Sequence, residues 1–311
     1  MKNFKKPIII SGMPRTGTTP LGRILSSLDD LSMIYEPFNA KQGVTSIEFN
    51  YPYPGNNISE NRFNKIFNDL IHLKSKFKTG ILSTDPILKK IFKYFIGNES
   101  SISFHRVRLF KNDNRLLIKD PFLIFSSAEL SKNYKIIFCE RPLKPLASSF
   151  KRMNWNFTEY DKLSKFFSES KLKARMLKPS EKISSEVVGA IQFYELVDLY
   201  KSKIDANKNI YYFSQDKLVE DPIVEIKSLF EWLELEFSET VKKTIAELKN
   251  DKNSNKNFPR KNIQHDMRYN KKFSNKYFTE VLTLHEIELI ENFCSGGEIW
   301  TPDLRIMIPL L

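Results

Sequence analysis

The 311-residue sequence contains few cysteines and no long apolar run. Its two cysteines, Cys139 and Cys294, form neither a disulfide framework nor the spacing of a metal site. Near the N-terminus only three consecutive apolar residues, Ile8 to Ile10, precede a Ser-Gly pair, so we expect no secretory signal peptide. No segment approaches the roughly 18–20 apolar residues that a membrane-spanning helix requires. These absences predict a cytoplasmic protein without a membrane span, and leave open only peripheral contact with a membrane.

The composition predicts a folded protein with anionic partners. Hydrophobic residues make up 41% of the chain and aromatic residues 13%, which excludes a disordered protein. The length is enough for one α/β domain over residues 1–311, with helical additions. A formal net charge of +12 favours anionic partners, among which are a phosphorylated cofactor, a nucleic acid and an acidic glycan.

The stretch from Pro7 to Phe38 predicts a strand, a glycine loop and a helix. Ile8 to Ile10 is a β-branched apolar run that is typical of a buried strand. A tight loop then leads to Thr19-Pro20, where we expect Thr19 as the N-cap and Pro20 as the first helical residue. Backbone N–H groups and the positive end of the helix dipole meet in such a loop, so it predicts a site for an anion.

The loop differs from a nucleotide-binding Walker A loop at one decisive position. Gly12 and Gly17 have the Walker A spacing, but Thr18 stands where that loop needs its lysine. The cation lies inside the loop instead, at Arg15. The string PRTGTT resembles the 5′-phosphosulfate-binding loop of the sulfotransferases, whose donor is 3′-phosphoadenosine 5′-phosphosulfate (PAPS). The resemblance implies that the loop binds PAPS through Arg15, Thr16, Gly17, Thr18 and Thr19.

A glutamate follows the second predicted strand. Pro37 favours an extended conformation at Glu36, and the carboxyl ends of parallel strands share one sheet edge, where open α/β sheets bind ligands. From the residues alone, a solvated carboxylate at a strand end is the favoured interpretation of Glu36. The segment YEPF resembles the Glu-Pro segment of tyrosylprotein and carbohydrate sulfotransferases, which implies that Glu36 is the general base.

A third strand is predicted in RLLIKDPF, from Arg115 to Phe122. The resemblance places its end beside the transferring group, which implies that Lys119 stabilises the sulfonyl oxygens and that Asp120 is the alternative base. Two other interpretations remain open. One is a Walker B strand with Asp120 as a magnesium ligand, and the other is a Lys-Asp-Pro turn without chemistry.

A fourth strand, from Tyr134 to Arg141, runs into a predicted helix. Arg141 and Ser149 are eight positions apart, which resembles the second sulfotransferase signature, the site of the donor's 3′-phosphate. An arginine can donate two charge-assisted hydrogen bonds to a phosphate, and a serine on the adjoining helix adds a third donor. Ser148 is the alternative serine.

Two segments are less informative. Residues 39–110 predict a helical insertion over the acceptor site, with helices at 61–76 and 86–95 whose spaced apolar residues are expected in the core; these are Phe63, Ile66, Phe67, Leu70, Ile87, Ile91, Phe92 and Phe95. Residues 251–277 are basic, and the resemblance implies a loop over the cofactor, with Arg260, Lys261 and Arg268 as candidate contacts.

Together the motifs predict a P-loop-like three-layer α/β/α fold with a central parallel sheet and helical insertions. The resemblance, closest to bacterial and carbohydrate-type sulfotransferases, implies transfer of a sulfonyl group from PAPS to an acceptor hydroxyl, with adenosine 3′,5′-bisphosphate as product. Glu36, Arg15 and Lys119 are the expected catalytic residues, and no metal is expected. The expected acceptor is a saccharide, on a glycan or a glycolipid, and not a nucleic acid.

Two other functions are weighed against this one. A P-loop nucleotide kinase or NTPase would need magnesium, and the missing loop lysine argues against it. A non-catalytic nucleic-acid-binding protein would use the positive charge, but the sequence has no helix-turn-helix, zinc-finger or base-stacking signature. Magnesium-dependent ATP hydrolysis would support the first, and steeply salt-dependent oligonucleotide binding the second.

Overall fold

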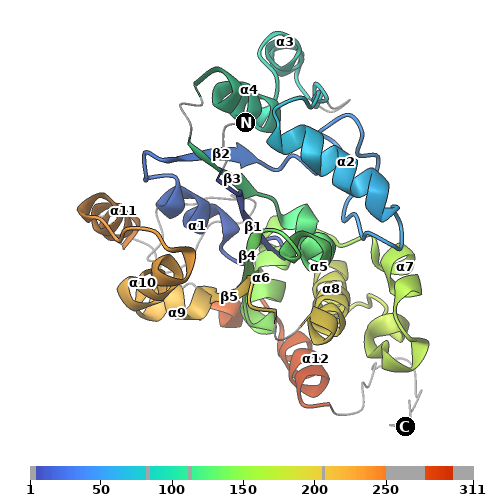
Figure 1. The fold of residues 1–311 in the computed structure, drawn as a ribbon. Helices are drawn as coiled ribbons and strands as arrows, with labels where there is room; N and C mark the ends of the chain where they lie inside the picture. The colour runs from blue at the N-terminus through green and yellow to red at the C-terminus, as the bar shows by residue number, and fades with distance from the viewer. Residues whose placement is uncertain (1–4, 82–84, 111–113, 205–206, 250–276, 297–311) are drawn as a thin grey trace. The chain divides into compact units, whose positions relative to one another are not determined.

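The structure is a computed structural model that describes residues 5–81, 85–110, 114–204, 207–249 and 277–296 (Figure 1). The chain divides into two compact units. The first comprises Met1–Glu140, Ala206–Gln215 and Asp221–Leu248, and the second comprises Arg141–Asp205, Asp216–Glu220 and Lys249–Leu311. The predicted cofactor loop at 251–277, with Arg260, Lys261 and Arg268, lies outside the described residues except for Tyr277.

The first unit is built on a parallel five-stranded sheet of order β2-β3-β1-β4-β5. The strands are β1 (Ile8–Gly12), β2 (Leu31–Tyr35), β3 (Arg115–Lys119), β4 (Lys135–Glu140) and β5 (Ile210–Ser214). Ile8, Ile9 and Ile10 are fully buried, as expected for a central strand covered on both faces. The predicted α/β class with a central parallel sheet is confirmed.

The strand order determines which strand ends are neighbours. β3 lies between β1 and β2, so Lys119 pairs in register with Ile10 on one side and with Tyr35 on the other. On the far side of β1, Gly12 pairs with Cys139 of β4. The residues that follow β1, β2 and β3 therefore emerge from the same edge of the sheet.

Helices of the first unit accompany this sheet (Figure 1). They are α1 (Thr18–Leu25), α2 (Glu60–Ile71), α3 (Ile87–Phe95), α4 (Glu99–Phe110), the 3-10 helix η1 (Pro121–Ser126), α5 (Ser127–Ser131), α10 (Pro222–Leu233) and α11 (Glu239–Lys249). The predicted start of α1 is wrong by two residues. Gly17 is the N-cap with φ 91°, the helix begins at Thr18, and Pro20 is its third residue. Glycine takes this left-handed conformation without the strain that a Cβ would add.

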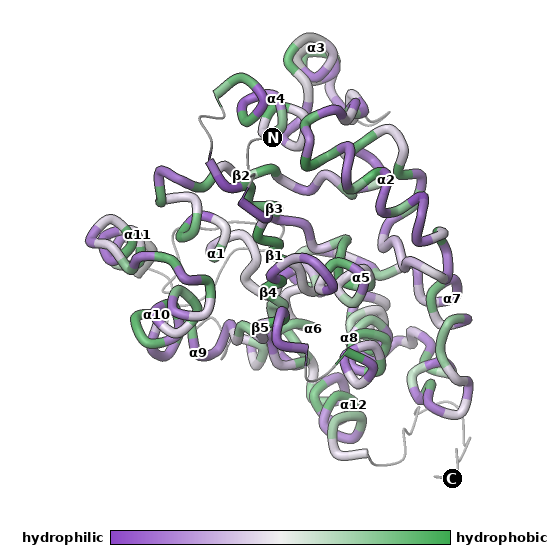
Figure 2. The backbone as a smooth tube through the Cα atoms, viewed as in Figure 1, coloured by the Kyte–Doolittle hydropathy of each residue, from purple (hydrophilic) through white to green (hydrophobic). Residues whose placement is uncertain are grey.

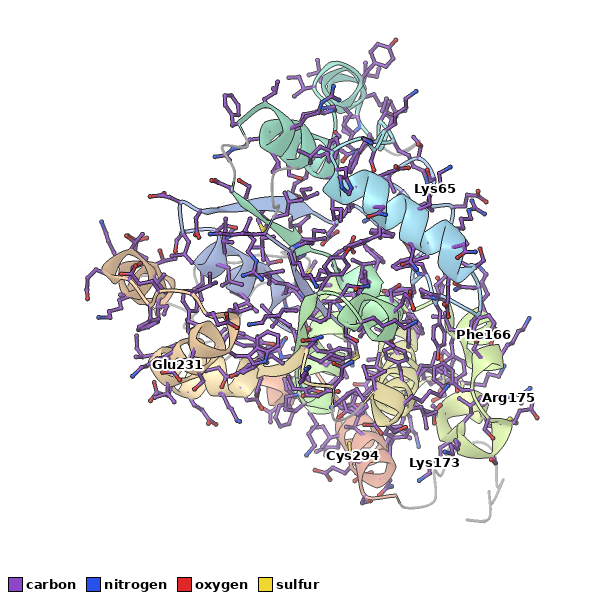
Figure 3. The ribbon with its side chains drawn as sticks, viewed as in Figure 1. Lys65, Phe166, Lys173, Arg175, Glu231 and Cys294 are labelled. Atoms are coloured by element: carbon purple, nitrogen blue, oxygen red, sulfur yellow. The ribbon has the colours of Figure 1, made fainter. Side chains whose placement is uncertain are left out.

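The second unit is helical. It contains α6 (Leu143–Met153), α7 (Tyr160–Leu163), η2 (Ser164–Phe166), η3 (Glu169–Lys171), η4 (Lys173–Met176), α8 (Ser185–Ile204), all but the first residue of α9 (Gln215–Glu220), η6 (Tyr277–Glu280) and α12 (Leu284–Cys294). Lys151 of α6 forms an ion pair with the buried Glu286 of α12, with Nζ 2.6 Å from Oε2. The cysteines are not bridged, since Cys139 is buried in β4 and Cys294 is exposed on α12 (Figure 3).

Residues 39–110 divide into a core part and an exposed part. α2 buries Phe63, Ile66, Phe67 and Leu70, as its spacing predicts, although it ends at Ile71 and not at 76. The expectation for Ile87 is wrong, because this residue of α3 is largely exposed. The side chains of Ile91, Phe92 and Phe95 lie outside the described part of the structure. α4 was not expected from the sequence; Figure 2 shows that both α3 and α4 mix apolar and polar residues.

Candidate active site

The loop between β1 and α1 is held by its own backbone and by two residues with left-handed φ angles. Arg15 has φ 74° and Gly17 has φ 91°. The Thr16 hydroxyl donates to the Met13 carbonyl at 2.6 Å, and the Thr16 N–H donates to the same oxygen at 3.3 Å. An arginine in this region of φ is strained by about 1–2 kcal/mol, and such strain is concentrated at functional sites.

The loop ends at the N-terminus of α1, where backbone N–H groups can bind an anion. The N-cap Gly17 makes no side-chain capping bond, so the first N–H groups of α1 are left for another acceptor. The side chain of Gln215 lies beside Gly17, where an added Cβ would be 3.3 Å from Gln215 Cγ. Within the described structure, the buried amide oxygen of Gln215 has no hydrogen-bond partner. The N–H groups at the start of α1 are the donors that fit the 5′-phosphosulfate end of PAPS, because the Gln215 amide oxygen can only accept.

Glu36 follows β2 in a strained conformation that several bonds support. Its φ is 44°, which non-glycine residues rarely adopt. Its N–H donates to the Lys119 carbonyl at 2.8 Å, and the hydroxyl of Ser100 on α4 donates to the Glu36 carbonyl at 3.2 Å. The backbone of Glu36 is thus fixed to β3 on one side and to the start of α4 on the other.

Asp120 fixes the chain just beyond Glu36. The side chain is fully buried, and its two oxygens accept hydrogen bonds from Phe38 N–H at 2.5 Å and Phe122 N–H at 2.9 Å. The first bond holds the segment after Glu36, and the second caps η1. The geometry therefore gives Asp120 a positioning role, and the proposal of Asp120 as a magnesium ligand receives no support from it.

Lys119 forms a buried ion pair with Glu36. Its Nζ lies 2.6 Å from Glu36 Oε1, and the exposed fractions of the two side chains are 3% and 18%. The ammonium also lies 4.3 Å from the centre of the Tyr35 ring, a cation–π distance. The stem of Lys119 passes close to Gly22 of α1, where an added Cβ would be 3.6 Å from Lys119 Cγ. The absence of a side chain at Gly22 leaves room for this stem.

Three carboxyl groups compete for the single buried ammonium of Lys119. Burial and then the charge of Glu36 raise the pKa of Asp120 to about 8. The same two causes, in the same order, raise the pKa of Glu99 at the start of α4. Burial and the charges of Glu36 and Glu99 also raise the pKa of Tyr35. Raised carboxyl pKa values of this kind, caused by burial and a neighbouring carboxylate, are concentrated at functional sites.

The remaining predicted residues, Arg141 and Ser149, belong to the second unit. Arg141 follows β4 directly and is buried, and Ser149 is buried on α6. The hydroxyl of the neighbouring Ser148 donates to the Pro145 carbonyl at 3.0 Å, a bond within the helix.

Tyr277 adds a group that the sequence did not indicate. Its ring lies 5.9 Å from Arg141 Cζ, and its side chain is buried. Burial acts against ionisation of the phenol, but Arg141, hydrogen bonds with Ser148 and Ser149, and Arg152 together hold the pKa of Tyr277 below its ordinary value. This part of the second unit therefore stabilises negative charge, as a phosphate site must.

Sequence reasoning missed Tyr35, Glu99 and Tyr277. Tyr35 precedes the Glu-Pro segment, but an apolar strand residue carries no signal of a cation above its ring. Glu99 comes from α4, which was not expected. Tyr277 lies at the end of the basic stretch, and only its position beside Arg141 gives it meaning.

The sequence matches a known family over nearly its whole length. Residues 5–296 correspond to the family described as "Sulfotransferase domain". The chain belongs to this family. Family membership confirms the predicted enzyme class, a sulfotransferase, and its predicted donor, PAPS. It also decides against the kinase and the nucleic-acid-binding protein as interpretations of the chain.

Solved sulfotransferase structures resemble this chain distantly. Mouse sulfotransferase SULT7A1, complexed with PAP, is 12% identical, with 94% of this chain and 83% of that chain covered and a TM-score of 0.43. Sulfotransferase STF9 of Mycobacterium avium is 12% identical, with 94% and 76% covered and a TM-score of 0.43. The sulfotransferase domain of the Synechococcus PCC 7002 olefin synthase is 13% identical, with 94% and 96% covered and a TM-score of 0.42. No curated protein matches the sequence.

Proposed function

We propose that this sulfotransferase moves the sulfonyl group of PAPS to a hydroxyl of a saccharide, on a glycan or a glycolipid, with Glu36 as the general base. Glu36 is assigned as the base because it forms an ion pair with Lys119. The pair lies at the edge of the sheet from which the loop after β1 also emerges. The unusual φ of Glu36 is held by hydrogen bonds to β3 and to α4, and backbone strain of this kind is concentrated at functional sites.

Glu36 removes the proton from the acceptor hydroxyl as the hydroxyl oxygen attacks. Its Oε1 is bound by Lys119, and its Oε2 lies 3.4 Å from the amide nitrogen of Asn39, a long contact that an acceptor hydroxyl can displace. Positioned general bases contribute about 10²–10⁴-fold to a rate. Once Glu36 is protonated, the Lys119 ammonium loses its anionic partner and becomes available to the sulfonyl oxygens. The Lys119 ammonium thus stabilises the carboxylate of Glu36 before proton transfer and the sulfonyl oxygens after it.

The loop residues stabilise the negative charge that develops on the leaving phosphate. PAPS supplies an activated sulfonyl group whose leaving group is that phosphate. Arg15 donates from inside the loop, and Gly17, Thr18 and Thr19 offer the first N–H groups of α1. Because both donor groups of Thr16 are bonded to Met13, we assign Thr16 to the support of the loop.

Arg141 and Ser149 bind the 3′-phosphate of the donor. The local chemistry supports this assignment, since buried Arg141, Arg152 and two serines already favour an anionic phenol at Tyr277. In general, binding energy at a part of a substrate that does not react contributes to the rate through positioning.

The saccharide acceptor is supported by the similarity of the loop and of the Glu-Pro segment to the carbohydrate-type enzymes. A reducing compartment, the cytoplasm, suits the two unbridged cysteines. To test the acceptor class, the protein is incubated with donor labelled in its sulfonyl sulfur and with neutral glycans, neutral glycolipids and tyrosine peptides in parallel. We expect label in a saccharide fraction with wild type, and about 10²–10⁴-fold slower labelling with Glu36→Gln. Label in the peptides alone would contradict the saccharide assignment.

A further inference from the structure

Helices α3 and α4 of the first unit expose apolar side chains that a water-facing helix would bury. Leu88 and Tyr94 of α3 are 82% and 69% exposed, and Leu109 and Phe110 of α4 are 76% and 70% exposed. Of the exposed large apolar residues of the described structure, most come from residues 81–110; these are Ile81, Ile87, Leu88, Tyr94, Ile96, Ile102, Leu109 and Phe110. Single exposed apolar residues need no explanation, but a concentration of this kind indicates a binding surface.

The polarity of α3 is inverted relative to an ordinary surface helix. Its Lys93 is buried, with Nζ 2.8 Å from the Gly80 carbonyl and 2.7 Å from Asp85 Oδ2. A cation is thus turned inward and paired, while Ile87, Leu88 and Tyr94 face outward. α2 of the same unit provides the internal comparison, since all four of its spaced apolar residues are buried. The apolar exposure of α3 is therefore a feature of this helix and not of the unit.

α4 buries Phe104 and Val107, but it also buries polar residues at its beginning and exposes apolar residues at its end. Ser100 and Ser101 are buried, and Ser101 is bonded to Asn98, whereas Leu109 and Phe110 at the other end are exposed. Figure 1 shows α3 and α4 next to each other at one end of the first unit. We call the exposed apolar residues of these two helices the α3–α4 face; it consists of Ile87, Leu88, Tyr94, Ile102, Leu109 and Phe110.

The charge of this segment indicates what covers the face. Residues 87–110 contain five lysines and arginines and one acidic residue, Glu99. Lys93 is buried and paired with Asp85, so it does not contribute to the charge of the face. Arg106 and Arg108 are exposed on α4 between the exposed apolar residues. Exposed apolar side chains next to exposed cations suit the interface of an anionic bilayer, where the apolar groups enter the headgroup region and the cations meet lipid phosphates. None of the described helices is long and apolar enough to cross a bilayer.

We propose that the α3–α4 face binds the surface of an anionic lipid bilayer, with its apolar side chains in the headgroup region and Arg106 and Arg108 on the lipid phosphates. Attraction between cations and anionic headgroups contributes about 1 kcal/mol for each lysine or arginine near the surface. The apolar residues add the part of the affinity that salt does not screen.

The face also narrows the acceptor class, a step that rests on the proposed function. The N-terminal end of α4 touches the active site, because Ser100 bonds to the Glu36 carbonyl and Ser103 accepts from Tyr35 N–H at 2.9 Å. The exposed end of this twelve-residue helix is about 16 Å further along, at 1.5 Å per residue. The polar headgroup of a glycolipid can bridge that length. The acceptor hydroxyl is then borne by a membrane lipid.

Vesicle cosedimentation tests membrane binding without donor or acceptor, so its failure is separate from a failure of the proposed function. The probes are vesicles of phosphatidylcholine with and without phosphatidylglycerol. Wild type should bind the anionic vesicles, and Leu88→Gln/Leu109→Gln/Phe110→Gln should bind at least ten-fold more weakly. The matched control is Met176→Gln/Val224→Gln/Leu284→Gln, three exposed apolar residues elsewhere, which should bind like wild type. Arg106→Gln/Arg108→Gln should lose the part of the vesicle binding that decreases when salt is added.

Three results would overturn the proposal. One is no cosedimentation of wild type with anionic vesicles, and another is an equal loss in the control variant. The third is a dimer of the wild type in sedimentation velocity that the Leu88→Gln/Leu109→Gln/Phe110→Gln variant dissolves, which would assign the face to a second copy of the chain. Circular dichroism on each variant establishes that it is folded.

Discussion

Lys119 Nζ lies 2.6 Å from Glu36 Oε1, and both side chains are largely buried at the ends of adjacent strands. The chain separates these residues by 83 positions, and the parallel register of β2 and β3 brings them together. The pair joins the proposed base to the proposed stabiliser of the sulfonyl oxygens. Changes at either residue should therefore affect both catalysis and stability.

The substitution Glu36→Gln should abolish most turnover while leaving nucleotide binding intact. Glutamine retains the shape of the side chain but cannot accept the proton, so we expect kcat to fall about 10²–10⁴-fold. Affinity for adenosine 3′,5′-bisphosphate should change little. Turnover equal to wild type would exclude Glu36 as the base.

Lys119→Met should destabilise the fold as well as slow the reaction. It leaves the Glu36 carboxylate mostly buried without its cation, and we expect a loss of about 2 kcal/mol in the free energy of unfolding, below the range for fully buried pairs because Glu36 is partly exposed. Urea denaturation measures this loss. The double variant Glu36→Gln/Lys119→Met should lose less than the sum of the single variants. Strict additivity would show that the two side chains do not interact.

Asp120 should make the protein less stable as pH rises from about 4 to about 8. Its pKa is raised to about 8 in the folded state, from an ordinary value of 3.8, so over this interval the unfolded chain has released a proton that the folded chain retains. The contribution of Asp120 is full below its ordinary pKa and is lost as pH rises through the folded value.

The variant Asp120→Asn removes this titration and one of the two accepted hydrogen bonds. Its free energy of unfolding, measured by urea denaturation at several pH values, should fall less steeply with pH than that of wild type. Its kcat should also fall, because the segment after Glu36 loses the bond at Phe38. Parallel stability curves for the two proteins would contradict the raised pKa.

The neighbouring serines on α6 offer a matched pair. Ser149→Ala should weaken the binding of adenosine 3′,5′-bisphosphate about ten-fold, the loss of one hydrogen bond to a charged group. Ser148→Ala should have little effect, because the Ser148 hydroxyl already donates to the Pro145 carbonyl within the helix. Calorimetric titration of both variants makes the comparison. A larger loss of affinity in Ser148→Ala than in Ser149→Ala would assign the 3′-phosphate contact to Ser148.

The sequence sufficed for the parts of the fold and site that local signals determine. Short segments of the sequence are enough to predict the buried strand Ile8 to Ile10, the glycine loop and the polar residues at strand ends. A parallel sheet then gathers such ends at one edge, so Glu36 and Lys119 could be named before their contact was seen. The start of α1 was misplaced because Gly17, and not the threonine expected as the cap, takes that position.

The rest depends on long-range packing that periodicity does not encode. The spacing of Ile87 and its neighbours indicates an apolar face on α3, but not whether other residues cover it, and the structure leaves Ile87 exposed. Glu99 reaches the site only because α4 packs on β2, with Ser103 and Ser100 bonded to Tyr35 and Glu36. Tyr277 gains its importance from Arg141, 136 positions earlier in the chain by sequence number. In both cases the contacting residues are too far apart in the sequence for a local pattern to predict the contact.

The most direct test of the account is calorimetric titration of adenosine 3′,5′-bisphosphate, without metal, into wild type, Arg141→Lys and Arg141→Ala. We predict tight binding to wild type, weaker binding to the lysine variant, which keeps the charge without the bidentate geometry, and a loss of about 100-fold or more in the alanine variant. Absence of binding to wild type, with magnesium-dependent binding of ATP in its place, would contradict the donor site proposed for this sulfotransferase.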